Sequence, residues 1–184
     1  MALAIDWDFI ASPAIEGRNL VAVVPDAAHS NSGVTCGMGV DLGQMTSGEM
    51  MALGLPQPLL IKCISYAGLR GMVAAKALAA QPLTLTSDEC ALLEAPKKRA
   101  VQVKLSLEYL KAAASPFEEL PQGGQTVLAS LTWQYGDMPT RTPRAWAAAV
   151  RKDWVLLGAD LANFGDRYPA RHIAEAAYLK AHLT

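Results

Sequence analysis

Three residues in the first quarter of the chain have side chains suited to acid–base hydrolysis: Glu16, Thr35 and Asp41. Hydrolysis of a glycosidic bond needs one protonated carboxyl group, which gives a proton to the leaving oxygen. It also needs a second carboxylate, which activates water or attacks the sugar. Glu16 follows the apolar Ile15, and partial desolvation there would favour the protonated form that an acid requires. The residue types therefore suggest Glu16 as the acid and Asp41 as the second carboxylate.

Asp41 and Thr35 both lie in a glycine-rich segment. Small residues surround Asp41 in the run Gly39-Val40-Asp41-Leu42-Gly43, and such a loop lets a polysaccharide approach the backbone closely. Thr35 precedes Asp41 by six residues, so in a plain extended strand their side chains would share a face. We expect Thr35 to hydrogen-bond the attacking water beside Asp41.

The same three residues also fit a purely structural interpretation. Isolated carboxylates are common on protein surfaces, so Glu16 could be a solvated residue at the end of a helix. Asp41 could be a turn residue or a helix cap, and Thr35 an ordinary strand residue. Spacing alone favours this interpretation over the catalytic one.

The segments that must position these residues are of two kinds. Residues 17–48 are rich in Gly, Ser, Asn and Asp, and their apolar runs 21–24 and 34–40 predict two short strands joined by a turn. Most of the remaining chain has helical patterns and helix-start signals. The expected helices cover residues 5–15, 47–53, 56–65, 71–80, a long segment from 86, 99–113, 125–135, 143–150, 153–163 and 169–183.

Prolines interrupt two of these helical segments. Pro13 lacks an N–H and must sit at a break or in a fresh first turn within residues 5–15, which Asp6 caps. Gly17 then marks the end of that segment, directly after Glu16. Pro96 marks either a break or a kink before residues 99–113.

These elements predict a mostly helical α+β fold, with a small β-hairpin region near the N-terminus and a helical body. We expect one domain over residues 1–184, because no internal repeat or low-complexity linker is visible. Small, Gly-rich strands beside a helical body predict two lobes with a ligand cleft between them.

Composition excludes several classes of protein. The chain is 52% hydrophobic and 18% charged, which argues against disorder, and its net charge of −1 predicts no strong attraction to nucleic acid or anionic lipid. The first residues lack a basic segment followed by a long apolar run, so we expect cytoplasmic synthesis without a secretory signal. No run of 18 uncharged apolar residues occurs, so we expect no membrane insertion.

The cysteines and histidines do not form a metal-ligand pattern. No CxxC pair occurs, and the histidines are not at zinc-ligand spacing from the cysteines. We therefore expect neither a metal site nor a cofactor. The odd number of cysteines leaves at least one unpaired within a monomer, which indicates a reducing site of synthesis. The residues concerned are Cys36, Cys63, Cys90, His29, His172 and His182.

Residues 33–44 read Gly-Val-Thr-Cys-Gly-Met-Gly-Val-Asp-Leu-Gly-Gln. This segment resembles the G-V-T-x-G-x-G-x-D-L-G-Q signature of pesticin-type muramidases, which include bacteriocin catalytic domains, phage endolysins and related effectors. The preceding Glu16-Gly17 resembles the catalytic Glu-Gly pair of that family. Weaker likeness continues through residues 56–59, 66–71, 134–136 and 171–178, so it spans nearly the whole chain.

The resemblance implies a fold like that of phage lysozymes and a role for each candidate residue. Glu16 would be the general acid, Asp41 the carboxylate that orients or activates water, and Thr35 its helper. Gln44 and Tyr66 flank the motif loops, and we expect them to contact sugar. The family position after the threonine is usually aliphatic. Here it is Cys36, which we expect to act as a small buried hydrophobe.

The function implied is hydrolysis of the β-1,4 bond between N-acetylmuramic acid and N-acetylglucosamine, causing lysis of the bacterial cell wall. By analogy with phage lysozymes we expect inversion at the anomeric carbon. The alternative is a catalytically inactive lysozyme-like module that binds the wall or serves a phage or secretion machine, since fold does not fix function. A peptidase or amidase is less well supported, because no zinc-ligand or Cys–His pattern occurs.

The implied partner is the glycan strand of peptidoglycan, and we expect the protein to bind it as a monomer. The expected place of action is the periplasm or the cell wall, which the protein would reach by release or delivery. An endolysin, an injected effector and a bacteriocin domain all fit, although the short chain disfavours a complete bacteriocin. An effector would also have a cognate immunity protein, which would plug the cleft.

Overall fold

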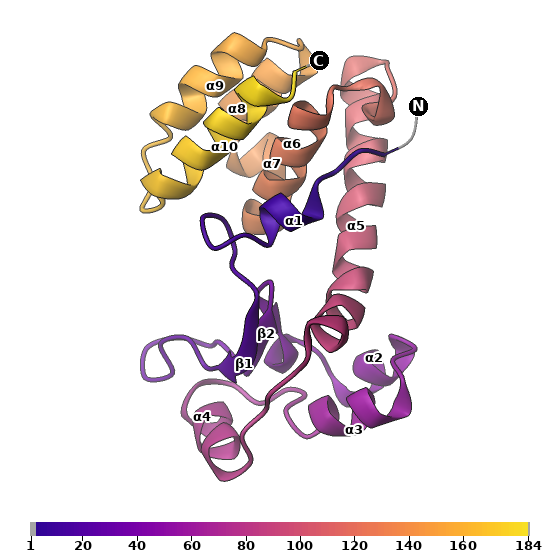
Figure 1. Cartoon of the computed structure of the whole chain (residues 1–184), viewed down its shortest axis with the longest axis vertical. Coiled ribbons are helices and arrows are strands. Elements are labelled where there is room, and N and C mark those ends of the chain that lie inside the picture. Colours follow the sequence, from indigo (N-terminus) through magenta and orange to yellow (C-terminus); the bar gives the residue numbers. More distant parts are fainter. Residues whose placement is uncertain (1–2, 184) are drawn as a thin grey trace. The chain divides into compact units, whose positions relative to one another are not determined.

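The computed structural model describes residues 3–183. The described chain separates into two compact units, which are considered individually (Figure 1). One is Glu16–Lys98, and the other consists of the described residues of Met1–Ile15 together with Arg99–Thr184. Helices dominate, and the strands form one small antiparallel sheet. The predicted α+β, mostly helical class is thus confirmed, whereas the single domain over residues 1–184 stays a prediction.

The unit Glu16–Lys98 contains the sheet, whose strands follow the order β1-β2-β3. Helices α2, α3 and α4 and the first part of α5 complete this unit, and buried aliphatic side chains and all three cysteines form its core. The bounds are β1 Asn19–Val23, β2 Thr35–Gly37, β3 Val40–Asp41, the 3-10 helix η1 Leu42–Gln44, α2 Ser47–Ala52, α3 Gln57–Ile64, α4 Gly71–Ala80 and α5 Ser87–Ala113.

The other unit is helical and is organised around α6, which is buried from residue 123 to residue 133. Helix α10 packs against both α9 and α6. Figure 1 labels the α-helices of this unit. Their bounds are α1 Trp7–Ile10, the 3-10 helix η2 Phe117–Glu119, α6 Gln122–Tyr135, α7 Met138–Arg141, α8 Pro143–Val150, α9 Trp154–Ala162 and α10 Pro169–Ala181.

The predicted cap of the first helix is confirmed, but that helix is shorter than expected. The Asp6 carboxylate accepts hydrogen bonds from the backbone N–H groups of Asp8 and Phe9. Helix α1 ends at Ile10, and residues 11–16 form turns. Pro13 has no N–H to continue a helix across this segment, so Glu16 lies in a turn and not at the end of a helix.

Helix α5 is continuous across Pro96, so the predicted alternative of a break is wrong. The helix begins at Ser87, directly after Thr86, close to where the sequence predicts it. Thr86 accepts a hydrogen bond from the Glu89 N–H, and the Glu89 carboxylate accepts one from the Thr86 N–H. This reciprocal pair satisfies N–H groups that otherwise have no partner in a first turn.

The second predicted strand, residues 34–40, is a hairpin of two strands. Its two strands, β2 (Thr35–Gly37) and β3 (Val40–Asp41), are antiparallel. Thr35 pairs with Asp41, and Cys36 pairs with Val40. Gly39 makes the reversal possible because its φ of +73° lies in the left-handed region that side chains disfavour. The prediction of one extended strand is therefore wrong.

No helix within residues 3–183 is both long enough and apolar enough to cross a membrane.

Helix α10 carries three buried polar residues, Arg171, His172 and Glu175, toward α6. Glu175 accepts hydrogen bonds from Ser130 Oγ at 2.5 Å and from Arg171 Nε at 3.0 Å. His172 Nδ1 lies 2.7 Å from Glu175 Oε2, and its Nε2 lies 3.2 Å from Asp166 Oδ2. A neutral imidazole donates through only one nitrogen, so donation to both carboxylates requires the charged ring.

Stability of the protein is expected to fall as pH rises above about 6.5, the ordinary pKa of histidine. Burial alone favours a neutral His172, but its bonds to Glu175 and Asp166 outweigh burial and raise its pKa. A raised pKa in the folded state stabilises the fold below the unfolded pKa, and this contribution disappears as pH passes the folded value. Urea unfolding across pH should therefore separate wild type from His172→Gln most at acidic pH. An equal separation at every pH would contradict this.

Candidate active site

The Asp41 carboxylate accepts several hydrogen bonds from the residues around it. Asp41 ends β3 and caps η1, where its Oδ1 accepts from the Gly43 N–H at 2.8 Å. The Gly33 N–H lies 3.1 and 3.0 Å from the two carboxylate oxygens, and Gln44 Nε2 donates to Oδ2 at 3.3 Å. These donors fix the orientation of the carboxylate. The structural interpretation of Asp41 as a cap is therefore correct, and it is compatible with a catalytic role.

Gly33 allows this arrangement because it has no side chain. A Cβ at this position would lie 2.4 Å from Asp41 Oδ1 and 2.5 Å from the Gly43 Cα. Both distances are far below van der Waals contact. Any larger residue at Gly33 would therefore displace either the carboxylate or the loop after β3, which gives a physical reason for glycine at this position of the motif.

Thr35 lies opposite Asp41 in the β2–β3 hairpin. Directly paired residues of antiparallel strands project from the same face of the sheet, with Cβ atoms about 4.5–5.5 Å apart. The two side chains therefore share a face of the sheet through cross-strand pairing, and not through one extended strand as predicted. Thr35 Oγ1 donates to the Gly33 carbonyl at 3.1 Å, so the backbone of Gly33 positions both Thr35 and Asp41.

Glu16 reaches the same hairpin from the turn that precedes β1. A Cβ added to Gly39 would lie 3.7 Å from Glu16 Oε2, which places this carboxyl group beside the β2–β3 turn. Glu16 is partly buried, as are Thr35 and Asp41. The structure therefore gathers two carboxyl groups and one hydroxyl around a single hairpin, the set of groups that glycosidic hydrolysis uses.

Glu94 belongs to the support of this hairpin and was not predicted from sequence. It is completely buried on α5 and accepts from Arg18 at 3.1 and 2.9 Å, from the Met38 N–H at 3.1 Å, and from Lys98 at 3.1 Å. The Met38 contact anchors the β2–β3 turn next to Gly39. Only the four-residue spacing of Glu94 and Lys98 is visible in the sequence, since Arg18 lies 76 residues away.

The two predicted sugar contacts differ in exposure. Gln44 is exposed, and its amide donates to the Asn31 carbonyl as well as to Asp41. Tyr66 is buried in the core, where its hydroxyl donates to the Gln81 carbonyl. The burial of Tyr66 favours a packing role. Contact of either residue with sugar stays a prediction.

The cysteines are buried and have no disulfide partners. Burial, with smaller contributions from neighbouring groups, raises the pKa of the Cys36 thiol to about 12 and that of Cys63 to about 11. The prediction that Cys36 acts as a small buried hydrophobe is confirmed, because its side chain is fully buried in the core of this unit. Within residues 3–183, no cluster of His, Cys, Asp and Glu could hold a metal ion.

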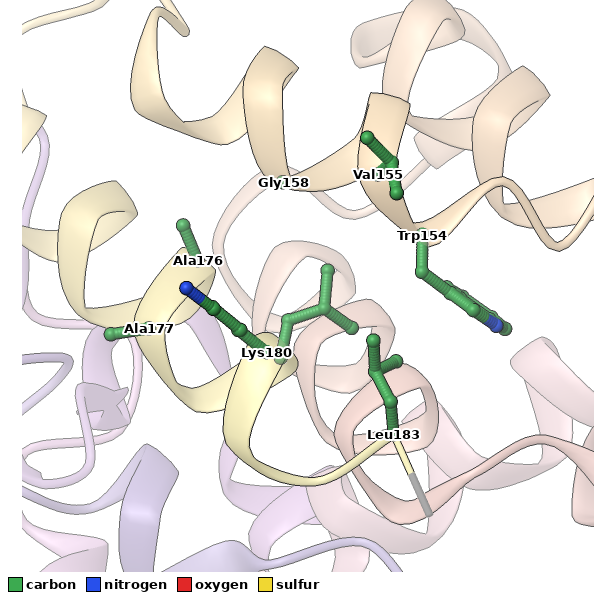
Figure 2. A pocket seen from close by; sticks show the side chains of 8 residues that line it. Trp154, Val155, Gly158, Ala176, Ala177, Lys180 and Leu183 are labelled. Carbon is green, nitrogen blue, oxygen red and sulfur yellow. The ribbon is translucent and has the colours of Figure 1, made fainter.

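Two pockets differ in the chemistry of their linings. One, of about 370 Å³, adjoins the hairpin and includes Asp41 in its wall. The other, of about 450 Å³, is an apolar groove between α9 and α10 (Figure 2). Trp154 and Val155 line it from α9, and Lys180 is its charged residue. The lining of the α9–α10 groove contains no carboxyl group, whereas that of the pocket beside the hairpin contains the Asp41 carboxyl group.

Comparison with known proteins gives one family. Residues 4–155 match the model of the pesticin family, described as the C-terminal part of a bacterial toxin homologue of phage lysozyme. No curated protein matches the chain. The family match includes Glu16, Thr35 and Asp41, as well as Glu94 and Arg18.

Proposed function

The chain belongs to the pesticin family, whose members are homologues of phage lysozyme, and from this membership we propose that it is a peptidoglycan muramidase. Its reaction is hydrolysis of the β-1,4 bond between N-acetylmuramic acid and N-acetylglucosamine. The observation that carries the proposal is the gathering of Glu16, Thr35 and Asp41 at one hairpin. Family membership supports a lysozyme-like hydrolase, and this hairpin supplies the groups for the reaction.

The proposed roles follow from the hydrogen bonds of each group. Glu16 gives its proton to the leaving glycosidic oxygen. Thr35 uses its hydroxyl proton on the Gly33 carbonyl, so its oxygen can still accept a hydrogen bond from water. Asp41, held by Gly33 and Gly43, takes a proton from that water or stabilises the cationic sugar. Gln44 and Tyr66 are proposed to contact the sugar.

Inversion is the proposed stereochemistry, by analogy with phage lysozymes. A water held between Thr35 and Asp41 would attack the face of the sugar opposite to the leaving group. Proton NMR of the product, recorded before the new reducing end equilibrates, would show the α-anomer. A β-anomer would instead indicate a covalent intermediate.

Mass spectrometry of soluble products tests the proposed reaction directly. Purified sacculi digested with the protein should release muropeptides that end in a reducible N-acetylmuramic acid, detected as a two-hydrogen mass gain after borohydride treatment. New peptide termini without new reducing ends would indicate a peptidase or amidase. Binding to sacculi without any soluble product would indicate a catalytically inactive module.

The proposed place of action is the periplasm or the cell wall, reached by release or delivery. The family description as a bacterial toxin homologue supports a bacteriolytic role. If the protein is an injected effector, a cognate immunity protein would bind over the catalytic residues. We propose that the protein acts as a monomer on the glycan strand.

A further inference from the structure

The pocket that adjoins the β2–β3 hairpin is lined mainly by side chains that the hydrolysis itself does not require. Its first wall, from the loop around β3 and η1, consists of Gly39, Val40, Asp41 and Gln44. The remainder of the lining is mainly apolar and comes from Met45, Leu53, Leu93 and Pro96. Its volume of about 370 Å³ is within the usual range for a small-molecule site, roughly 300–1,000 Å³. The pocket can therefore hold a group that remains attached to the sugar at Asp41.

Helix α5 gives this pocket one cationic side chain. Leu93, Pro96 and Lys97 are spaced by three and four residues, so they lie on the same face of the helix. Lys97 is exposed and lines the pocket together with the apolar residues. Its ammonium group can form a charge-assisted hydrogen bond to a carboxylate, a group that N-acetylglucosamine lacks.

Pro96 leaves one backbone carbonyl of helix α5 without its helical hydrogen bond. It has no N–H, so the Leu92 carbonyl, four residues earlier in the continuous helix α5, lacks its usual helical donor. That carbonyl lies next to the proline ring, which itself lines the pocket. A ligand with amide N–H groups would satisfy it.

We infer that this pocket binds the peptide stem attached to the lactyl group of N-acetylmuramic acid, with Lys97 on a stem carboxylate. The stem combines small apolar side chains, amide N–H donors and free carboxylates. These match the apolar lining, the Leu92 carbonyl and the Lys97 ammonium respectively. The pocket includes Asp41, so a stem bound there stays connected to a sugar at the catalytic groups. The inference rests on the proposed muramidase function.

The test compares strands that carry the stem with strands that lack it, in which an amidase leaves a free carboxylate on the lactyl group. Soluble glycan strands with intact stems, and the same strands stripped by a lactyl-amide amidase, are cut by wild type and by Lys97→Gln. Lys97→Gln should lower kcat/KM about tenfold on stem-bearing strands, and leave it unchanged on stripped strands. Lys97→Arg should retain most of the wild-type value. Lys76→Gln, an exposed lysine on α4 outside the pocket, is the charge-matched control.

A second variant tests the apolar lining. Leu53→Trp adds an aromatic ring to the pocket wall and should also reduce the preference for stem-bearing strands. Equal wild-type kcat/KM on both substrates, or equal losses on both for Lys97→Gln, would overturn stem binding while the muramidase proposal stands. If wild type cuts neither substrate, the muramidase proposal fails and stem binding at this pocket fails with it.

Discussion

Glu16→Gln is expected to lower kcat for release of reducing ends from peptidoglycan by about 10²–10⁴-fold, the usual contribution of a positioned general acid. Glutamine has nearly the shape of glutamate but carries no proton that it can give to a leaving oxygen. The side chain lies beside the β2–β3 turn and is partly buried. The measurement is the initial rate of reducing-end formation on purified sacculi.

Glu119→Gln is the matched control for this variant. Glu119 is an exposed residue of η2, so the same change of charge and size should leave the rate near that of wild type. Urea unfolding of both variants should show that they are folded under the assay conditions. If Glu16→Gln cuts sacculi as fast as wild type, Glu16 is not the acid.

The second large effect is expected for Glu94→Gln, which should lower the free energy of unfolding by about 3–5 kcal/mol. Glu94 is completely buried, and its carboxylate neutralises Arg18 and Lys98. A glutamine amide can still accept from the Met38 N–H, but it removes the buried negative charge that faces Arg18 and Lys98. Breaking a buried ion pair from one side is costly because the remaining charge stays poorly solvated.

Urea unfolding measures this loss, and an exposed pair supplies the comparison. Lys62→Gln breaks the pair with Glu89, in which the lysine side chain is 44% exposed, and should cost no more than about 1 kcal/mol. The double variant Arg18→Met with Glu94→Gln should lose less than the sum of the single variants, because both single variants break the same ion pair. Strict additivity would show that Arg18 and Glu94 do not interact energetically.

Glu94→Gln should also affect catalysis at temperatures where the variant is folded. The Glu94 carboxylate holds the Met38 N–H, and Met38 precedes the Gly39 that lies beside Glu16. A looser turn would misplace the acid relative to the sugar. A loss of kcat in the folded variant would make Glu94 a positioning residue that acts through the β2–β3 turn.

Local signals in the sequence were sufficient for much of the fold. Two of these signals, the Asp6 cap and the Thr86–Glu89 pair, are interactions between residues only a few positions apart. Such interactions are visible in the sequence because a few neighbouring side chains decide them. The helix start at Pro143 depends on the backbone of that proline alone. Helix α7, with only four residues around Pro139, is too short to show a helical period and was missed.

The hairpin shows why the site could be predicted only in part. The alternation of residues 34–40 fits a single strand, and the decisive feature is the conformation of Gly39, which the residue type permits but does not require. The spacing of six between Thr35 and Asp41 is compatible with either arrangement. The Glu94 contacts depend on long-range folding, which brings residues 18, 38 and 94 together.

The three buried thiols have a consequence for the behaviour of the protein in oxidising surroundings. In the folded chain they are covered and remain protonated, since burial raises the pKa of each. Oxidants and disulfides react with thiolates and need access, so the folded protein resists oxidation without having a disulfide. An unfolded chain would expose an odd number of thiols, and one would always be left to pair with another molecule. A chain that enters oxidising surroundings already folded avoids this mispairing.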